Sequence, residues 1–123
     1  MSKPTLYERL GGYDGIAAFV EDLLPRLQSD SLLGRFWLNR GRDGIKREKQ
    51  LLISFLCAGT GGPMYYTGRG MKLSHEGMNI SDADWIRFMG HAGDAMKELA
   101  LPEPECKEIA AFVRSLRQEI VEA

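Results

Sequence analysis

The sequence predicts an all-α protein, and three features lead to that prediction. Apolar residues recur at the spacing of one helical face along almost the whole chain. No stretch shows the alternation of apolar and polar residues that a half-buried strand needs. Glycine and proline gather between the periodic stretches, where they end helices and allow turns. A chain of 123 residues suits one compact domain, which we expect to span residues 1–123.

The first long helix is predicted over residues 13–28. Its apolar face comprises Ile16, Phe19, Val20, Leu23, Leu24 and Leu27. Because proline removes a backbone donor and crowds the preceding turn, we expect a kink or an early end at Pro25. Ser31 is expected to begin a short helix, and residues 39–44 to form a loop. The short helix carries Leu32, Leu33, Phe36 and Trp37.

A second long helix is expected over residues 45–58. Its apolar side comprises Leu51, Leu52, Phe55 and Leu56. The glycines and proline of residues 59–63 should end it. An irregular segment over 64–70 and a short helix over 71–76 are expected to follow.

Two further helices complete the chain. Ser81 has the position of an N-cap, with Asp84 three residues later. The helix that follows carries an apolar face of Trp85, Phe88, Met89, Ala92, Met96 and Leu99. Pro102 and Pro104 separate it from the last helix, whose inner side comprises Ile109, Phe112, Val113, Leu116 and Ile120. The chain therefore has four longer helices and several short ones.

The composition argues against nucleic-acid binding and against a membrane protein. The net charge is −1 and the pI about 6.1, whereas nucleic-acid proteins usually carry a basic excess on one face. The N-terminus has no apolar signal core, and no stretch approaches transmembrane length. We expect a cytoplasmic protein that is a monomer or a weak homo-oligomer. One basic cluster, interpreted as a solvated loop and helix start, comprises Arg40, Arg42, Lys46, Arg47 and Lys49.

The two cysteines do not predict a metal or disulfide framework. Cys57 lies in an apolar run, and a free cysteine usually packs there as a small apolar residue. Cys106 lies far away in the sequence, and there is no CxxC motif, so a zinc site or a disulfide scaffold is not expected.

The strongest candidate for chemistry is the segment 61–80, which contains His75. A neutral imidazole is a good axial ligand for heme iron, and the macrocycle needs apolar side chains against its faces. Arginine or lysine at the pocket mouth can pair with the anionic propionates. On spacing alone, a single histidine among apolar residues is more often a packed or surface residue than a ligand. His91, beside Gly90, is interpreted as a surface or packing residue.

A resemblance to a known family favours the interpretation of His75 as a ligand over that of a packed or surface residue. Residues 55–63 read Phe-Leu-Cys-Ala-Gly-Thr-Gly-Gly-Pro, and Tyr66-Thr-Gly-Arg69, Met71-Lys72 and His75 follow. This pattern resembles the signature of group I truncated hemoglobins, and residues 6–12 resemble the usual opening of that family. The likeness runs from about Leu6 to the C-terminus.

The resemblance implies a truncated globin-like 2-over-2 helical sandwich, in which two antiparallel helix pairs hold one heme b (iron protoporphyrin IX). It implies that His75 is the proximal iron ligand, with Arg69 and Lys72 as propionate partners. Its expected heme contacts are Phe36, Leu52, Phe55, Tyr66, Met71, Met78 and Ile80. These apolar residues would also suit the core of any helical fold.

The distal side departs from the family. Many members place a Phe-Tyr pair on the first long helix, where this chain has Leu23-Leu24, so the hydroxyl that donates to a bound ligand is missing. Glu48 stands where glutamine is common, and Leu51 and Leu52 occupy the next turn. If the register is one residue different, Lys49 faces the pocket, either as a donor or as an iron ligand. Glu48 and Lys49 can equally be a solvated charged face, and Tyr7 is a further candidate donor.

Three functions remain open at this point. The first is reversible binding of a diatomic gas, O₂ or else NO or CO, at ferrous iron. The second is an enzyme on the same fold, either a nitric oxide dioxygenase that needs an external reductase or a peroxidase-like enzyme. The apolar residues Leu24, Leu51 and Leu52 disfavour the peroxidase, because it needs a polar acid–base pair above the iron. The third is a heme-free helical sensor or interaction module.

Overall fold

The computed structural model describes residues 4–38, 41–63, 75 and 77–122. Within these ranges every regular element is a helix, as the sequence predicts. In chain order the elements are α1 (Leu6–Arg9), α2 (Gly12–Ser29), the 3₁₀ helix η1 (Leu33–Trp37), α3 (Arg42–Gly59), α5 (Asp82–Glu98), α6 (Glu103–Arg114) and α7 (Arg117–Ile120). None of the described helices combines the length and the apolar character needed to cross a bilayer.

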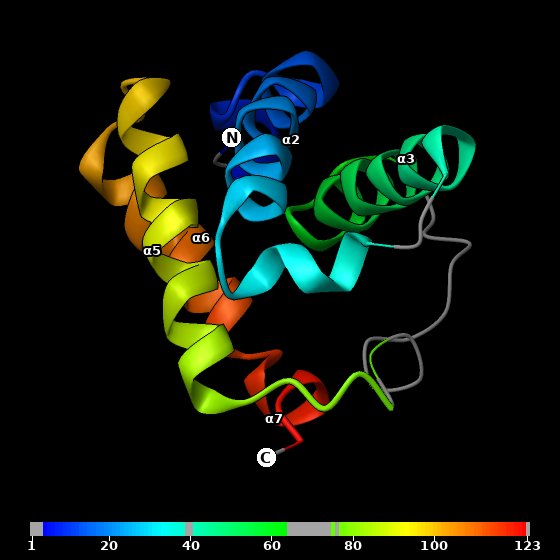
Figure 1. Ribbon diagram of the computed structural model, residues 1–123. Coiled ribbons are helices and arrows are strands. Elements are labelled where there is room, and N and C mark those ends of the chain that lie inside the picture. The colour runs from blue at the N-terminus through cyan, green and yellow to red at the C-terminus, as the bar shows by residue number, and fades with distance from the viewer. Residues whose placement is uncertain (1–3, 39–40, 64–74, 76, 123) are drawn as a thin grey trace.

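The four longer helices form two pairs, α2 with α3 and α5 with α6. Helix α2 packs against both α3 and α5, and α5 packs against α6. Figure 1 shows α5 and α6 side by side on one flank, α3 on the other, and α2 between them. This arrangement is the predicted 2-over-2 sandwich.

The core lies where the apolar faces of these helices meet. All six residues predicted for the inner face of α2 are buried, and Val20 is fully inaccessible to solvent. Cys57 of α3 is also fully buried, which confirms its interpretation as a core residue. Trp85, Ala92 and Met96 supply the α5 side.

Several boundaries differ from the prediction. Pro104 lies in the first turn of α6 and not before the last helix, because proline is tolerated where the helix leaves backbone N–H groups unpaired. Helix α2 continues through Pro25 to Ser29, since Pro25 is exposed and the buried residues on either side of it keep the helix packed. Helix α3 begins at Arg42 rather than at residue 45, because its first turn is polar and solvent-exposed and so carries no apolar period. The last helix is divided at Ser115, whose hydroxyl bonds to the Phe112 carbonyl and so competes with the helical ladder.

The short helix η1 begins at Leu33, with Leu32 as its N-cap residue, and not at Ser31 as predicted. The Oδ1 atom of Asp30 accepts hydrogen bonds from the backbone N–H groups of Leu32 at 2.7 Å and Leu33 at 3.0 Å. The side chain of Asp30 is 4% exposed, so this turn is anchored inside the protein. The hydrogen bonds of Asp30 therefore fix the direction in which the chain leaves α2 and enters η1.

Candidate functional site

His75 lies at the entrance to the turn that leads into α5. It has helical conformation and is half-buried. The N–H of Met78 donates to the His75 carbonyl at 3.2 Å. Gly77 and Asn79 both have positive φ, 84° and 57°, a conformation that glycine adopts freely and asparagine tolerates better than most residues. The turn is thus encoded locally, and it holds His75 close to the start of α5.

The start of α5 is in turn fixed by a capping box. The hydroxyl of Ser81 accepts from the Asp84 N–H at 3.2 Å, and the Asp84 carboxylate accepts from the Ser81 N–H at 2.9 Å. Each bond satisfies a backbone donor that the helix leaves free at its first turn. Ile80, one residue before this cap, is buried. The segment between His75 and α5 therefore has a defined path.

An ion pair connects η1 to the same cap. The guanidinium of Arg35 donates to both oxygens of Asp84, at 3.0 and 2.7 Å, and the Asp84 side chain is 1% exposed. This pairing outweighs burial and lowers the pKa of Asp84 to about 2. Arg35 also lies 4.2 Å from the centre of the Phe36 ring, a cation–π geometry. Phe36 is thereby held beside the start of α5.

A second anchor holds the other end of η1 against α5. The Asp30 carboxylate accepts from Arg87 at 3.0 Å and lies 2.7 Å from Nε2 of His91. These contacts, together with the backbone N–H groups at the start of η1, hold the pKa of Asp30 well below its usual range, and the largest contribution is the hydrogen bond with His91. His91 is therefore a packing residue, as its sequence position indicated.

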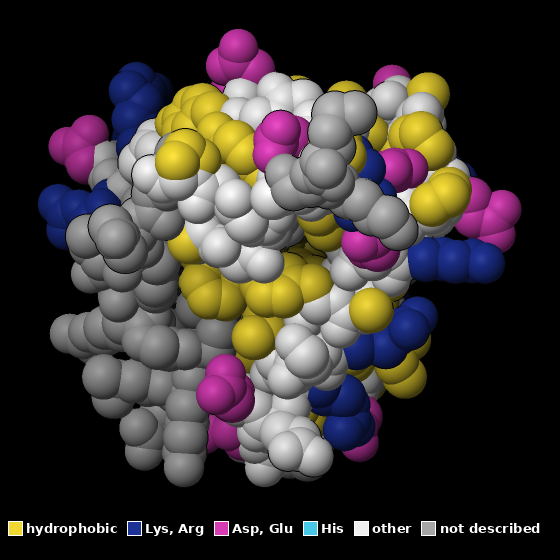
Figure 2. All heavy atoms as spheres, turned by 180° about the vertical axis from the view of Figure 1, so that it is seen from behind, with side chains coloured by type: hydrophobic (Ala, Val, Ile, Leu, Met, Phe, Trp, Pro, Cys, Tyr) yellow, Lys and Arg dark blue, Asp and Glu magenta, His cyan; other side chains and the backbone are white. Residues whose placement is uncertain are grey.

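Helix α3 presents large apolar side chains that protein atoms only partly cover. Its buried residues are Ile53, Leu56 and Cys57, whereas Leu52 and Phe55 are half-buried. The prediction for the inner side of α3 is therefore correct at Leu56, which is buried. Leu52 and Phe55 lie on the same side but are only partly covered. Figure 2 shows hydrophobic side chains gathered near the middle of the rear face of the molecule.

Aromatic contacts orient two of the predicted heme-contacting residues. Phe55 stacks on Phe112 of α6, with ring centres 5.8 Å apart and an interplanar angle of 27°. Phe36 meets Trp37 edge to face at 6.4 Å. Both geometries are favourable for aromatic pairs. Trp37 is half-buried and packs against the core next to Phe36, although the sequence interpretation did not include it among the site residues.

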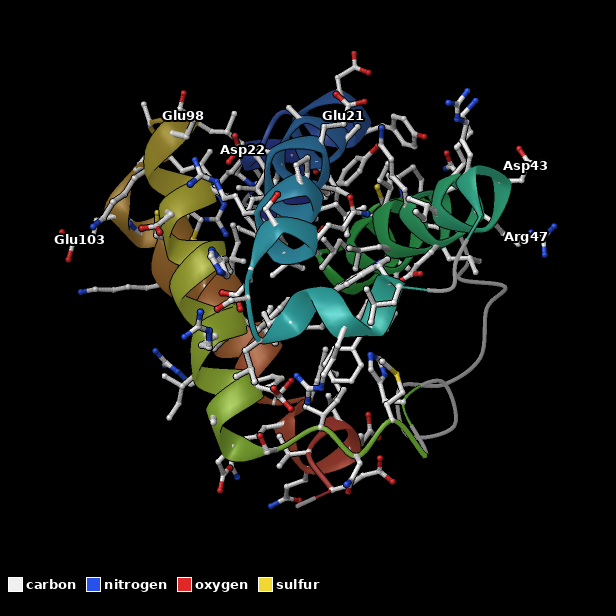
Figure 3. All side chains as sticks on the ribbon, in the orientation of Figure 1. Glu21, Asp22, Asp43, Arg47, Glu98 and Glu103 are labelled. Atoms are coloured by element: carbon white, nitrogen blue, oxygen red, sulfur yellow. The ribbon has the colours of Figure 1, made fainter. Side chains whose placement is uncertain are left out.

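Of the predicted distal residues, Leu23 and Leu24 lie on α2 and the others on α3, and these two helices pack against each other. Leu23 and Leu24 are buried, and Glu48, Leu51 and Leu52 are half-buried. The ammonium of Lys49 lies 3.0 Å from the Glu21 carboxylate, at the surface between the two helices. Figure 3 shows Glu21 on the outer side of α2, and Arg47 and Asp43 extending outward from the first turns of α3. In this structure Lys49 therefore belongs to the solvated charged face.

Tyr7, the other proposed donor, lies at the opposite end of α3. Its N–H donates to the Thr60 carbonyl at 2.8 Å. Its ring is so close to Gly62 that a Cβ there would come within 2.8 Å of it. Measured along α3, Thr60 lies about 10 Å or more from the turn that contains Glu48 and Leu52. The interpretation of Tyr7 as a distal donor finds no support in this placement.

Four predicted site residues, Tyr66, Arg69, Met71 and Lys72, lie outside the described residues. Within the described part of the chain, no three His, Cys, Asp or Glu side chains come together as a metal-binding group. A lone imidazole suits iron whose equatorial ligands all come from a macrocycle, because the protein then needs to supply only an axial ligand.

Comparison with known proteins agrees with this arrangement. The bacterial-like globin family matches residues 5–122. The chain belongs to the truncated hemoglobins of this family. The GlbN protein of Nostoc commune, a group 1 truncated hemoglobin, is 34% identical over 92 residues, which cover 75% of each chain. GlbN of Mycolicibacterium paratuberculosis is 29% identical over 116 residues, or 94% of this chain and 83% of that protein.

Solved structures of truncated hemoglobins share the fold. A mutant of the Tetrahymena pyriformis truncated hemoglobin, in the Fe(III) form, superposes with a TM-score of 0.89 at 25% identity. The match covers 98% of this chain and 100% of that one. A hemoglobin from Chloroflexus aurantiacus has the same fold, with a TM-score of 0.85 at 22% identity over 98% of this chain and 100% of its own. The cofactor of this truncated hemoglobin is accordingly heme b.

The residues present fit that cofactor. Phe36, Leu52 and Phe55 keep part of their apolar surface uncovered by protein, although uncovered aromatic and aliphatic surface is costly in water. A flat apolar macrocycle can cover such surface, and the half-buried imidazole of His75 offers a nitrogen for iron. When bound, heme supplies an iron atom that coordinates diatomic gases.

Proposed function

We propose that this truncated hemoglobin binds a diatomic gas at ferrous heme iron, with His75 as the proximal ligand. Support comes from the position of His75. It is the half-buried histidine at the turn before α5, in a chain whose helices, sandwich and family all belong to the globins. The only other histidine in the sequence, His91, is engaged by the buried carboxylate of Asp30. A neutral His75 would fix the iron through one ring nitrogen and leave the opposite position for the gas.

O₂ is the proposed ligand, and the distal side is expected to hold it weakly. Leu23 and Leu24 offer no hydrogen-bond donor from α2, and both are buried. A donor to a partly charged acceptor is typically worth about 1.5–3 kcal/mol. Without one, O₂ should dissociate quickly, while CO, which depends less on a donor, should be affected less. The half-buried leucines of α3 should keep water out of the same space.

The test compares the two histidines. Hemin is added to wild type, His75→Ala and His91→Ala, and absorption spectra are recorded in the ferric and ferrous states. We expect wild type and His91→Ala to give the same sharp Soret band at one heme per chain. His75→Ala should lose that band, and added imidazole should restore it by occupying the vacated position. An unchanged spectrum in His75→Ala would refute the assignment of the proximal ligand.

The gas assignment has a separate readout. The ferrous wild-type protein is mixed with O₂ and with CO, and both dissociation rates are measured by stopped-flow absorption. Rapid O₂ release with CO binding retained is the expected result. Failure of both gases to change the ferrous spectrum, with heme bound, would contradict the proposed function.

A further inference from the structure

The C-terminal segment pairs with the turn that follows His75. Helix α7 ends at Ile120, and Val121 is extended. The N–H of Glu122 then donates to the Ile80 carbonyl at 2.9 Å. Figure 1 shows the C-terminus directly beside the segment that leads into α5. Two parts of the chain that are more than 40 residues apart thus meet next to the candidate iron ligand.

The Glu122 side chain makes the closer contact. Its Oε1 atom accepts from the N–H of Asn79 at 2.7 Å, and its Oε2 atom accepts from the N–H of Gly77 at 3.1 Å. Both N–H groups point to one carboxylate, on a turn in which Gly77 and Asn79 have positive φ, and convergent backbone N–H groups of this kind bind anions. One carboxylate therefore satisfies two backbone donors of the turn between His75 and α5.

The electrostatics agree with this geometry. The hydrogen bonds from the N–H groups of Gly77 and Asn79 lower the pKa of Glu122. The Glu122 carboxylate is therefore ionised at neutral pH, and it binds the backbone two and four residues after His75. An ordinary surface glutamate would lack the two backbone bonds.

We propose that Glu122 is a positioning residue of the heme site. Its carboxylate holds the turn of residues 77–79, so that His75 keeps its orientation, and it also places a negative charge near the imidazole. This inference rests on the proposed function, in which His75 binds the iron. Groups that fix the orientation of a metal-ligating histidine affect metal affinity. A negative charge held near the site also favours the more positively charged ferric iron over ferrous iron.

Two substitutions separate orientation from charge. Glu122→Gln removes the negative charge and keeps one oxygen acceptor in place of two, and Glu122→Ala removes the charge and both acceptors. Glu119→Gln is the matched control, because Glu119 is an exposed glutamate on α7, three residues earlier. All three variants are prepared as the full-length, heme-loaded protein.

Three quantities are measured: the ferric–ferrous midpoint potential, the rate of hemin transfer to an excess of a heme acceptor protein, and hydrogen exchange at the Gly77 and Asn79 amides. Glu122→Gln should raise the potential, with a severalfold shift of the equilibrium toward ferrous iron. A tenfold shift would correspond to about 59 mV for one electron. Glu122→Ala should also accelerate amide exchange and hemin loss severalfold, and Glu119→Gln should match wild type.

Three negative outcomes are distinguishable. If His75→Ala abolishes the Soret band but neither Glu122 variant differs from Glu119→Gln, the positioning role is wrong and the proposed function stands. If His75→Ala leaves the spectrum unchanged, the proximal assignment fails and the role of Glu122 fails with it. If Glu122→Gln has a normal midpoint potential while Glu122→Ala loses hemin rapidly, the negative charge of Glu122 does not tune the iron and that part of the proposal is wrong.

Discussion

The ion pair between Arg35 and Asp84 should make a measurable contribution to stability that disappears in acid. Asp84 has an ordinary pKa of 3.8 and a pKa of about 2 in the folded protein. Each pKa unit corresponds to about 1.36 kcal/mol, so the difference amounts to about 2 kcal/mol. Arg35 is 42% exposed, and solvent screening of that partner reduces the expected value to about 1–2 kcal/mol.

The sign follows from the direction of the pKa change. Because folding lowers the pKa of Asp84, the ionised carboxylate stabilises the folded state at pH values above 3.8. The stabilisation is lost as the pH falls toward about 2, and about half of it should be gone at pH 3. Asp84→Asn should therefore cost about 1–2 kcal/mol at pH 7 and clearly less at pH 3.

The assay is urea unfolding of the heme-free protein, followed by circular dichroism between pH 3 and 7. Heme is omitted because a cofactor that binds only the folded state would add its own pH dependence. Asp82→Asn is the control, since Asp82 lies in the same first turn of α5 but is 61% exposed in its pair with Arg117. A cost of Asp84→Asn that is the same at pH 3 and pH 7, or no larger than that of the control, would refute the reasoning.

Four further predictions concern the helices around the heme. Gly59→Ala places a Cβ 2.3 Å from the Phe112 ring and should destabilise the protein by about 1–3 kcal/mol in urea unfolding. Gly44→Ala, where nothing lies within 4 Å, should instead stabilise α3 by about 0.5–1 kcal/mol, and a loss of stability there would contradict the packing. Leu24→Tyr should slow O₂ dissociation roughly tenfold by adding a donor, and an unchanged stopped-flow rate would mean that its hydroxyl does not reach the ligand. Lys49→Gln should leave the ferrous spectrum unchanged because the ammonium pairs with a surface carboxylate, whereas loss of low-spin bands would identify Lys49 as an iron ligand.

The helices and their inner faces could be predicted from the sequence because their signals are local. The 3.6-residue period on α2 identified all six of its buried residues, and Ser81 with Asp84 marked the start of α5. The family pattern directed attention to His75. These inferences need only residues within a few turns of one another, where backbone geometry decides which side chains share a face.

The contacts that define the site could not be predicted in the same way. Asp30 meets His91 and Arg87, and Asp84 meets Arg35, across helices whose relative placement no local pattern specifies. Glu122, next to the end of the chain, gave no signal at all before its carboxylate was found on the turn after His75.

Helical periodicity and the family pattern are properties of the linear chain, and they were enough to predict an all-helical globin with His75 as the candidate iron ligand. Only the tertiary structure decided that Phe55 remains partly uncovered while Ile53 is buried. It also decided that Lys49 pairs with Glu21 at the surface, and that the C-terminus supports the His75 turn. These features depend on how α2, α3 and α5 pack together, since burial and charge pairing arise only when separate segments meet.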